Sequence, residues 1–206
     1  MAKDEADGPT RIQARNRAAI LEAGLVAFSA QGFRGATVQA IAEGAGMTKP
    51  NLLYYFPSKE AVYLELLRSL LDAWLAPLRA LDPRGEPLGE VLGYVRRKLD
   101  LACRHPRESR LFAGEVLRGA PHLGAELSGP LRLLVDDRAA VIAGWMADGR
   151  LRPLDPHHLI FSVWALTQHY ADFDIQVRAV LGPGRDPWGE ADRHLQETFR
   201  RMLAPG

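Results

Sequence analysis

The sequence contains very little cysteine: Cys103 is alone among 206 residues. A single thiol excludes a disulfide within the chain. Apolar runs are short as well, and all fall below the roughly 18 residues that a membrane-spanning helix requires. The beginning, MAKDEADGPTR, is charged and lacks the apolar core of a signal peptide. Together these absences predict a cytoplasmic protein without a membrane partner.

Signals of catalysis and of bound cofactors are missing too. Cys103 and His105 lie two positions apart, where helical side chains point away from each other, so they do not form a nucleophile and its base. The sequence has no glycine-rich loop of the kind that cradles a phosphate. His157, His158 and His169 have no cysteine or paired carboxylate near them at metal-ligand spacing. We expect a protein that is not an enzyme, holds no metal and needs no cofactor.

Charge is nearly balanced over the whole chain but not along it. The sequence has 26 Lys and Arg against 25 Asp and Glu. Between residues 11 and 59, six basic residues stand against two acidic ones, a net charge of +4, whereas residues 61–206 are neutral overall. An anionic partner should therefore meet the first third of the chain.

Apolar residues recur at helical spacing over most of the chain. The first such run, with Ile20, Leu21, Leu25 and Phe28, predicts a helix over 12–30. Segments rich in Gly and Pro separate the runs, and no stretch alternates apolar and polar residues as a half-buried strand would. The predicted fold class is all-α, with about nine helices over 12–30, 38–45, 49–55, 58–81, 88–104, 106–118, 131–149, 156–180 and 189–203. Residues 1–10 offer no apolar group to bury and are predicted to be a disordered tail.

The segment TKPNLLYYFPSKEAVY, residues 48–63, is the most informative stretch. The short helices predicted at 38–45 and 49–55 meet at Gly46 through a three-residue turn, which indicates a helix-turn-helix. In that motif the second helix lies in the major groove of DNA and the first helix braces it. The second helix is polar and aromatic on its outer side, as a groove-reading helix is. A helical corner that never meets DNA is the alternative interpretation.

Basic and short polar side chains suited to DNA gather around this motif. Lys49 and Asn51 match phosphates or base edges, and Tyr54 matches phosphates and thymine methyl groups. A basic arm over residues 11–17, with Arg17 as its third cation, suits the neighbouring DNA backbone or minor groove. The predicted DNA-contacting residues are Arg11, Arg15, Arg34, Thr37, Thr48, Lys49, Pro50, Asn51, Tyr54, Tyr55 and Lys59.

The stretch FRGATVQAIAEGAGMTKPNLLYYFPSKEAVYLELL, residues 33–67, resembles the TetR family of repressors almost position by position. The resemblance implies a repressor that binds a palindromic double-stranded DNA operator as a homodimer. It also implies a helix-turn-helix DNA-binding domain over 11–57 and a ligand-binding and dimerisation domain over 58–206. It rests on Gly35, Thr37, Ile41, Ala42, Gly46, Tyr54, Tyr55, Phe56, Ser58, Lys59 and Glu60.

The stretches LLDAWLAPLRAL, SRLFAGEVLRGAP and HLIFSVWALTQHYADF are similar to those of pyrimidine-responsive members of this family. The similarity implies uracil or thymine as the small-molecule effector. Three places depart from that pattern. The loop 182–190 differs, and Arg118 and His122 stand where smaller or apolar residues are expected.

A site for such a ring needs an aromatic face beside groups that both donate and accept hydrogen bonds. Trp164 and Gln168 lie four apart on one helical face and supply both kinds of group. Trp74 lies about 24 Å along the predicted helix 58–81, at roughly 1.5 Å per residue, and Glu115 is expected to accept from a ring N–H. An aromatic stripe at this spacing is also typical of a core or a dimer seam. The predicted effector residues are Trp74, Phe112, Glu115, Trp164, Gln168, Tyr170 and Phe173.

The last two predicted helices are expected to pair with those of a second copy in a four-helix seam. An effector bound beside this seam would tilt helix 58–81 and change the spacing of the DNA-reading helices. Two alternatives stay open: a sensor of a larger hydrophobic compound, and a helical small-molecule-binding protein that does not bind DNA. The predicted seam residues are Leu159, Ile160, Val163, Leu166, Leu195, Phe199 and Met202.

Overall fold

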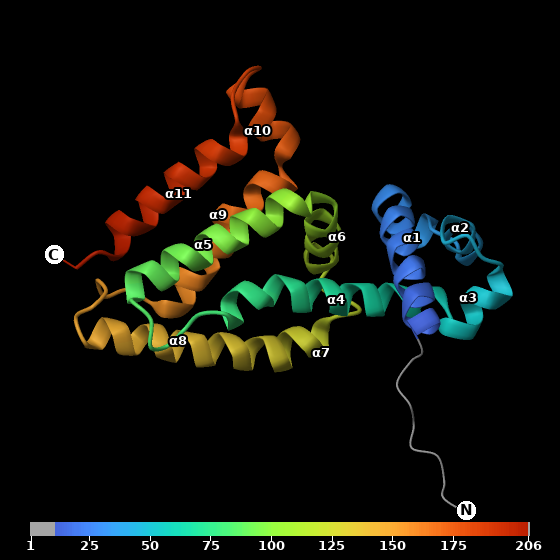
Figure 1. Ribbon diagram of the computed structural model, residues 1–206, viewed down its shortest axis with the longest axis horizontal. Helices are drawn as coiled ribbons and strands as arrows, with labels where there is room; N and C mark the ends of the chain where they lie inside the picture. The colour runs from blue at the N-terminus through green and yellow to red at the C-terminus, as the bar shows by residue number, and fades with distance from the viewer. Residues whose placement is uncertain (1–10, 206) are drawn as a thin grey trace, which may run out of the picture. The chain divides into compact units, whose positions relative to one another are not determined.

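The computed structural model describes residues 11–205, and every regular element within that range is a helix (Figure 1). The all-α prediction is confirmed. The tail predicted at 1–10 lies outside the described residues. The chain forms two compact units: unit 1, Met1–Ser69, and unit 2, Leu70–Gly206. Their boundary falls inside helix α4, Lys59–Arg79. The predicted domain boundary between residues 57 and 58 stays a prediction.

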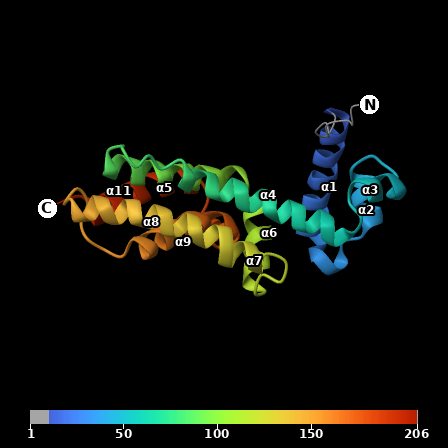
Figure 2. The same ribbon diagram turned by 90° about the horizontal axis from the view of Figure 1, so that it is seen from below.

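Unit 1 contains α1 (Arg11–Gly35), α2 (Val38–Gly44), α3 (Lys49–Tyr55) and the first part of α4. Helices α1 and α2 pack together, as do α2 and α3 (Figure 2). The backbone leaves helical geometry at Gly32, two residues after the predicted end of the first helix at residue 30. Apolar side chains from all four helices form the core, and those below 2% exposure include Ile20, Phe28, Ile41, Leu52 and Tyr63.

Unit 2 contains the rest of α4 and the remaining helices. Helix α5 packs against both α9 and α11, and α6 and α8 also contact α9 (Figure 1). The elements are α5 (Pro87–Arg104), α6 (Pro106–Leu117), α7 (Gly124–Glu126), a π-helical turn (Leu127–Leu131), α8 (Arg132–Ala147), α9 (Pro156–Asp172), α10 (Asp174–Leu181) and α11 (Pro187–Leu203).

Three long helices of unit 2 begin with the same local device. An acidic N-cap side chain accepts from the first free backbone N–H groups, and a proline occupies the next position, where no N–H is needed. Glu86 accepts from Leu88 and Gly89 at the start of α5. Asp155 and Asp186 do the same at the starts of α9 and α11. The acid–proline pairs therefore fix where α5, α9 and α11 begin.

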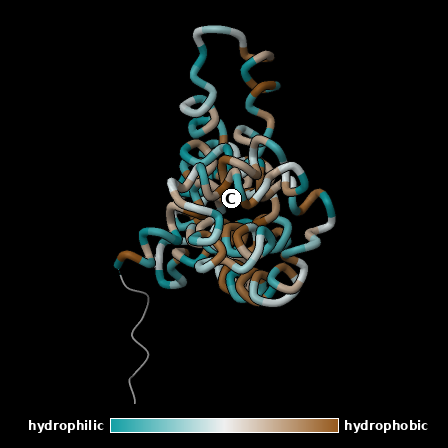
Figure 3. The backbone as a smooth tube through the Cα atoms, turned by 90° about the vertical axis from the view of Figure 1, so that its right-hand side faces the viewer, coloured by the Kyte–Doolittle hydropathy of each residue, from teal (hydrophilic) through white to brown (hydrophobic). Residues whose placement is uncertain are grey.

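The core of unit 2 lies between α5, α8, α9 and α11. Apolar positions recur along each helix rather than in long uninterrupted runs, as the hydropathy colouring shows (Figure 3). All four tryptophans of the chain lie in this unit, at Trp74, Trp145, Trp164 and Trp188. Among the helices of residues 11–205, none combines the length and apolar character needed to cross a membrane.

The prediction of one helix over 156–180 is wrong in one respect. The chain leaves helical geometry at Phe173, which separates α9 from α10. The Phe173 N–H still donates to the carbonyl oxygen of His169, so the break costs no backbone hydrogen bond at this position. No glycine or proline lies at this position. The apolar periodicity therefore predicted one continuous helix.

Most of the predicted dimer-seam residues face the core of their own chain. Five of them are at most 2% exposed within the single chain, because α9 and α11 both cover α5, and a second copy cannot reach them. The seam prediction is wrong for these five. On α9, the large apolar side chains that are exposed are Phe161 and Leu166, at 45% and 38% exposure. The five buried residues are Leu159, Ile160, Val163, Leu195 and Phe199.

Candidate DNA interface and effector site

The turn between α2 and α3 is built by two threonine caps and a glycine. The Thr37 hydroxyl accepts from the Ala40 N–H at 3.1 Å, and the Thr48 hydroxyl accepts from the Asn51 N–H at 3.4 Å. Gly46 has a φ of +69°, a left-handed conformation that costs a residue with a side chain free energy. These three residues set the angle at which α3 leaves α2, as a helix-turn-helix requires.

Most predicted DNA-contacting side chains are exposed on unit 1. Tyr54 is 74% exposed, and its ring packs edge-on against Tyr55 with 5.1 Å between ring centroids. The aromatic pair holds Tyr54 outward on α3 without burying it. The predicted contact of Tyr54 with DNA stays a prediction. The exposed members of the predicted set are Arg11, Arg15, Arg34, Thr37, Thr48, Lys49, Pro50, Asn51 and Tyr54.

Tyr55 is half-buried and joins α3 to α1. Its hydroxyl accepts from the Asn16 side-chain amide at 2.8 Å. Arg17 donates to the Tyr55 carbonyl oxygen at 3.2 Å and to the Glu65 carboxylate at 3.2 Å, and its guanidinium lies 4.3 Å from the centre of the Phe56 ring. Tyr55 and Arg17 therefore brace the reading helix from behind. The sequence prediction treated Arg17 as part of the DNA-contacting arm and missed this bracing role.

Lys59 also has an internal contact. Its ammonium donates to the Ala36 carbonyl oxygen at 3.0 Å and lies 4.6 Å from the centre of the Phe33 ring. These contacts fasten the start of α4 to the connection between α1 and α2. The predicted phosphate contact of Lys59 stays a prediction.

In unit 2, polar side chains line the contact between α5 and α9. Tyr94 and Lys98 lie four apart on α5, and Trp164, Gln168 and Asp172 lie four apart on α9, so each set occupies one helical face. The Trp164 indole N–H donates to the Tyr94 hydroxyl at 2.7 Å. Burial raises the pKa of the Tyr94 hydroxyl well above its ordinary value, against the lowering effect of this hydrogen bond. We call these five residues the α5–α9 polar ladder.

Lys98 is 2% exposed, which is rare for a lysine. Its ammonium lies 5.4 Å from the centre of the Trp74 ring, on α4. Burial lowers the pKa of Lys98 to about 7, and the negative charge of Asp172 opposes that shift only in part. Trp74 is itself buried, and its indole N–H has no hydrogen-bond partner among the described residues. Two N–H donor groups thus lie inside unit 2 with few acceptors.

Asp172 closes the other end of the ladder. Its carboxylate accepts from the buried Ser109 hydroxyl of α6 at 2.6 Å. Arg110 donates to the neighbouring Ala171 carbonyl oxygen at 3.0 Å. Burial raises the pKa of Asp172, against the lowering effects of the Ser109 hydrogen bond and the charges of Arg110, Lys98 and His169. Helices α5, α6 and α9 therefore bring opposite charges together in a partly desolvated place.

The predicted effector residues divide between the ladder and other places. Trp74, Trp164 and Gln168 belong to the ladder or lie against Lys98. Glu115 is 1% exposed and already has partners within the chain. Its carboxylate accepts from the His122 backbone N–H at 2.8 Å and lies 3.1 Å from Nδ1 of the His122 ring. The effector contact predicted for Glu115 stays a prediction.

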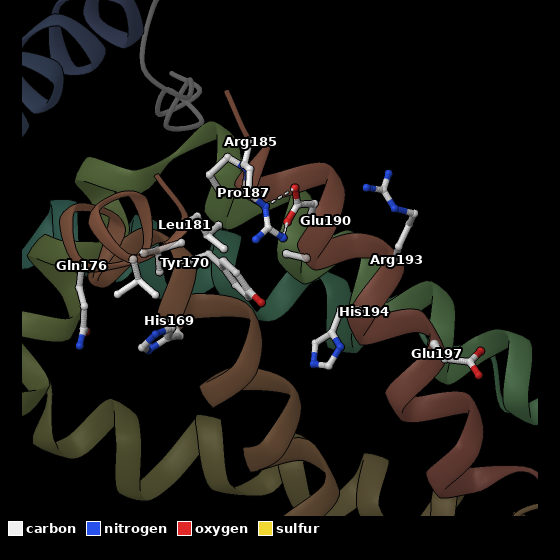
Figure 4. A pocket seen from close by; sticks show the side chains of 13 residues that line it. His169, Tyr170, Gln176, Leu181, Arg185, Pro187, Glu190, Arg193, His194 and Glu197 are labelled. Atoms are coloured by element: carbon white, nitrogen blue, oxygen red, sulfur yellow. Dashed lines mark hydrogen bonds and ion pairs between the residues drawn. The ribbon is translucent and has the colours of Figure 1, made fainter. Parts of the chain in front are cut away.

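The remaining aromatic candidates lie at the surface or at its edge. Phe112 is half-buried on α6. Phe173 is 53% exposed and stacks on His169 with 5.0 Å between ring centroids. Tyr170 lines an open cavity of about 840 Å³ between α9, α10 and α11 (Figure 4). The walls of that cavity also carry His169, Gln176, His194 and the ion pair between Arg185 and Glu190.

Sequence reasoning missed four polar members of this region. Lys98 had a readable signal, because it occupies a position where the apolar spacing of Val95, Leu99 and Ala102 calls for a buried residue. Tyr94 shares that face four residues earlier. Ser109 and Asp172 had no such signal, since only the packing of α6 on α9 brings them together. The four missed residues are Tyr94, Lys98, Ser109 and Asp172.

Comparison with known families accounts for nearly the whole chain. Residues 20–66 match the family described as "Bacterial regulatory proteins, tetR family". Residues 67–204, more than half of the chain, match the family described as "YcdC-like protein, C-terminal region". The two matches meet inside α4, close to the boundary between the two compact units.

Individual relatives agree with the family match. The HTH-type transcriptional regulator RutR of Escherichia coli (strain K12) is 52% identical over 173 residues, which cover 84% of this chain and 82% of RutR. The transcriptional regulator SCO4942 from Streptomyces coelicolor has a similar fold, with a TM-score of 0.75 at 22% identity over 93% of this chain and 99% of that one. The ketosteroid regulator KstR2 of Mycobacterium tuberculosis gives 0.72 at 22% identity over 92% and 95%.

These matches cover both the helix-turn-helix of unit 1 and the helical bundle of unit 2. They exclude the alternative of a helical protein unrelated to DNA. The chain therefore belongs to the TetR family of transcriptional regulators, and it is a DNA-binding, ligand-responsive regulator rather than an enzyme.

Proposed function

We propose that this regulator senses a pyrimidine base such as uracil or thymine and acts in the cytoplasm as a homodimeric repressor on a palindromic operator. The observation that carries the proposal is the α5–α9 polar ladder together with Trp74 of α4, whose indole N–H has no hydrogen-bond partner among the described residues. A uracil ring alternates carbonyl acceptors with N–H donors around a flat face. Lys98 and Trp74 supply donors, Asp172 supplies an acceptor, and Gln168 supplies both.

The sequence supports the same effector. The stretches that contain Trp74 and the Trp164–Gln168 pair are the ones that are similar to pyrimidine-responsive members of the family. A ligand pocket usually combines apolar walls with a few polar groups that fix orientation. Tyr94 and Lys98 are buried among the apolar core of unit 2, and Trp164, Gln168 and Asp172 are half-buried beside it.

Helix α4 connects sensing with DNA binding in this proposal. The one helix contains Lys59, next to the reading motif, and Trp74, against Lys98. An effector that moves Trp74 would move α4 and change the distance between the two reading helices of a dimer, which must be about 34–36 Å for successive major grooves. With a typical coupling of about 1–3 kcal/mol, the effector weakens operator binding about 5- to 150-fold.

A second candidate effector is a larger hydrophobic compound. The cavity of about 840 Å³ between α9, α10 and α11 favours it, because this volume exceeds what a single pyrimidine ring fills. The cavity has polar side chains at its rim, among them His169, Gln176 and His194. The two candidate sites use different glutamines, Gln168 in the ladder and Gln176 at the cavity, and this difference makes them separable.

Thermal unfolding with added ligand tests the proposal. A ligand that binds only the folded protein at a hundredfold excess over its Kd adds about 2.7 kcal/mol, which raises Tm by about 5–10 °C for a unit of this size. We expect uracil or thymine to raise Tm in the wild type, and Gln168→Leu to remove the rise. Gln176→Leu is the matched control and should keep it.

The opposite pattern would support the second candidate. If a steroid-sized compound raises Tm while uracil and thymine do not, and Gln176→Leu alone removes that rise, the pyrimidine assignment is wrong. The Trp74→Ala variant tests whether ligand binding is coupled to operator binding. If that variant keeps both ligand affinity and ligand-induced release from DNA, α4 does not couple the two activities through Trp74.

A further inference from the structure

Lys98 is a cation placed inside an apolar helix contact. It occupies a core position of α5, between Val95 and Ala102 on the buried face, and is 2% exposed. Among the described residues, its ammonium faces the Trp74 ring at 5.4 Å and the negative charge of Asp172. A ring at that distance is near the limit of a cation–π contact. The ammonium is therefore only partly compensated.

The surroundings contain more donors than acceptors. The Trp74 indole N–H has no partner among the described residues, and the Asp172 carboxylate already accepts from Ser109. The Trp164 indole N–H is satisfied by the Tyr94 hydroxyl. Buried polar groups without partners are rare, and they are often found where a ligand completes them. The missing group at this place is an acceptor.

The charge that acts on Lys98 comes from Asp172 on α9. Arg110 of α6 and His169 of α9 act on Asp172 in turn. On α5 itself, burial keeps the Tyr94 hydroxyl protonated by raising its pKa. Helix α4 contributes the uncharged Trp74. Asp172 is thus the anion that acts on Lys98, and burial outweighs it, so that the pKa of Lys98 falls to about 7.

We propose that Lys98 determines the specificity of the effector site: it selects ring compounds that present a carbonyl oxygen, and it takes up a proton when such a compound binds. The inference rests on the proposed effector site at the ladder and adds the chemical rule by which that site chooses its ligand. A carbonyl oxygen that faces Nζ stabilises the ammonium more than the neutral amine. The ammonium has only N–H donors, whereas the neutral amine also has a lone pair that a carbonyl oxygen cannot satisfy. The proton comes from solvent and is held by the nitrogen lone pair.

The direction of the pH dependence follows from this rule. Below pH 7 Lys98 carries its proton with or without ligand, and binding changes no protonation. Above pH 7 the free site is mostly neutral, whereas the occupied site stays protonated, so binding takes up a proton. Affinity should then fall up to tenfold per pH unit above pH 7 until the occupied site also loses its proton.

Calorimetric titration with uracil in two buffers of different ionisation enthalpy measures the uptake. At pH 8 the wild type should take up protons when uracil binds, because burial lowers the pKa of Lys98 in the free site to about 7. Lys98→Met should abolish the uptake and weaken uracil binding at least tenfold at pH 6.5. Arg104→Met removes an exposed cation from the same helix and should keep both uptake and affinity.

A comparison of ring compounds with and without carbonyl groups tests whether Lys98 selects ligands by their carbonyl oxygen. Unsubstituted pyrimidine has the same ring without carbonyl groups and should bind at least tenfold more weakly than uracil or thymine. Lys98→Met replaces the buried ammonium by an apolar side chain of similar length and leaves the Asp172 carboxylate its hydrogen bond from Ser109. The measurement of proton uptake needs only the wild type, so it decides the question even where the variant does not fold.

The outcomes separate this inference from the proposed function. If uracil binds at pH 8 without proton uptake, the role of Lys98 is wrong and the pyrimidine assignment stands. If uracil and thymine fail but 2-pyridone binds with proton uptake that Lys98→Met removes, Lys98 keeps its role and the pyrimidine assignment is wrong. If pyrimidine binds as tightly as uracil, or if none of the carbonyl compounds binds, the inference is overturned.

Discussion

The two units of the chain place their polar side chains in opposite ways. Unit 1 carries most of its predicted DNA-contacting groups on the surface, and its partly buried polar groups bond to one another, as Asn16 does with Tyr55 and Arg17 with Glu65. Unit 2 places Lys98 inside its core with incomplete compensation and leaves the Trp74 indole N–H unpaired. A reading surface benefits from a rigid, fully paired support, whereas a sensor benefits from an interior that a ligand completes.

The contrast also predicts how substitutions in each unit affect folding and binding. A substitution on the surface of unit 1 should remove a DNA contact and leave folding intact. A substitution in the interior of unit 2 should change folding and sensing together, because the same residues serve both. Three substitutions test this contrast, each measured by both folding stability and binding.

The largest effect is expected from Lys98→Met in unit 2. In the unfolded chain a lysine has a pKa of about 10.4, and in the folded chain burial lowers the pKa of Lys98 to about 7. Between these values the unfolded chain binds more protons, so the stability of the wild type rises with pH, and the full penalty of burying the charge applies below pH 7. The variant lacks this penalty but leaves the Asp172 carboxylate without its cation, so its stability relative to the wild type should rise by about 1–4 kcal/mol as the pH falls from 10 to 6.

Urea unfolding followed by circular dichroism at pH 6 and pH 9 measures this difference. The stability of the variant relative to the wild type should fall as pH rises from 7 toward 10. Other groups titrate in both proteins and cancel in the comparison. Parallel stability curves for the two proteins over that range would show that the folded chain leaves Lys98 with an ordinary pKa, and the contrast between the units would lose its main support.

An intermediate effect is expected from Tyr54→Ala in unit 1. Tyr54 is 74% exposed, so its removal should change the free energy of unfolding by less than about 0.5 kcal/mol. Operator binding should weaken by about 1–3 kcal/mol, or about 5- to 150-fold, on the scale of a good contact to DNA. A gel shift with a DNA fragment selected from a genomic pool measures the change, and Tyr54→Phe separates the hydroxyl from the ring. A loss of stability without a loss of DNA binding would reverse the role assigned to this residue.

The smallest effect is expected from Tyr55→Phe. The hydroxyl accepts one hydrogen bond, from Asn16, and a bond of this kind contributes about 0.5–1.5 kcal/mol to stability. Operator affinity should fall less than threefold. Asn16→Ala should cost a similar amount, and the double variant should cost less than the two single variants combined, because both remove the same bond. Fully additive costs would mean that the two groups do not interact in solution.

Local signals made much of the fold predictable. Thr37 and Thr48 cap the helices of the reading motif, and Gly46 adopts the left-handed turn, because each of these roles depends on a few neighbouring residues. Exposure on α3 followed as well, since a seven-residue helix between two turns has one face to bury. Sequence reasoning therefore placed the surface of unit 1 well.

Contacts between distant helices were not predictable in the same way. The five seam residues of α9 and α11 are buried because α5 covers them, and their own spacing does not say which helix will do so. The break at Phe173 has no glycine or proline to announce it. Ser109 and Asp172 lie 63 residues apart and meet only in the folded chain. Lys98 is the exception, because a lysine at an apolar position is visible in the sequence itself.

The placement of all four tryptophans in unit 2 gives the protein a spectroscopic property. Tryptophan emission comes from unit 2 alone, because unit 1 has tyrosines but no tryptophan. One of these fluorophores, Trp74, lies 5.4 Å from the Lys98 ammonium. The emission wavelength of an indole depends on nearby charge. Loss of the Lys98 proton should therefore shift the emission wavelength of Trp74. The regulator therefore carries an intrinsic optical indicator at the place where we propose that its effector binds.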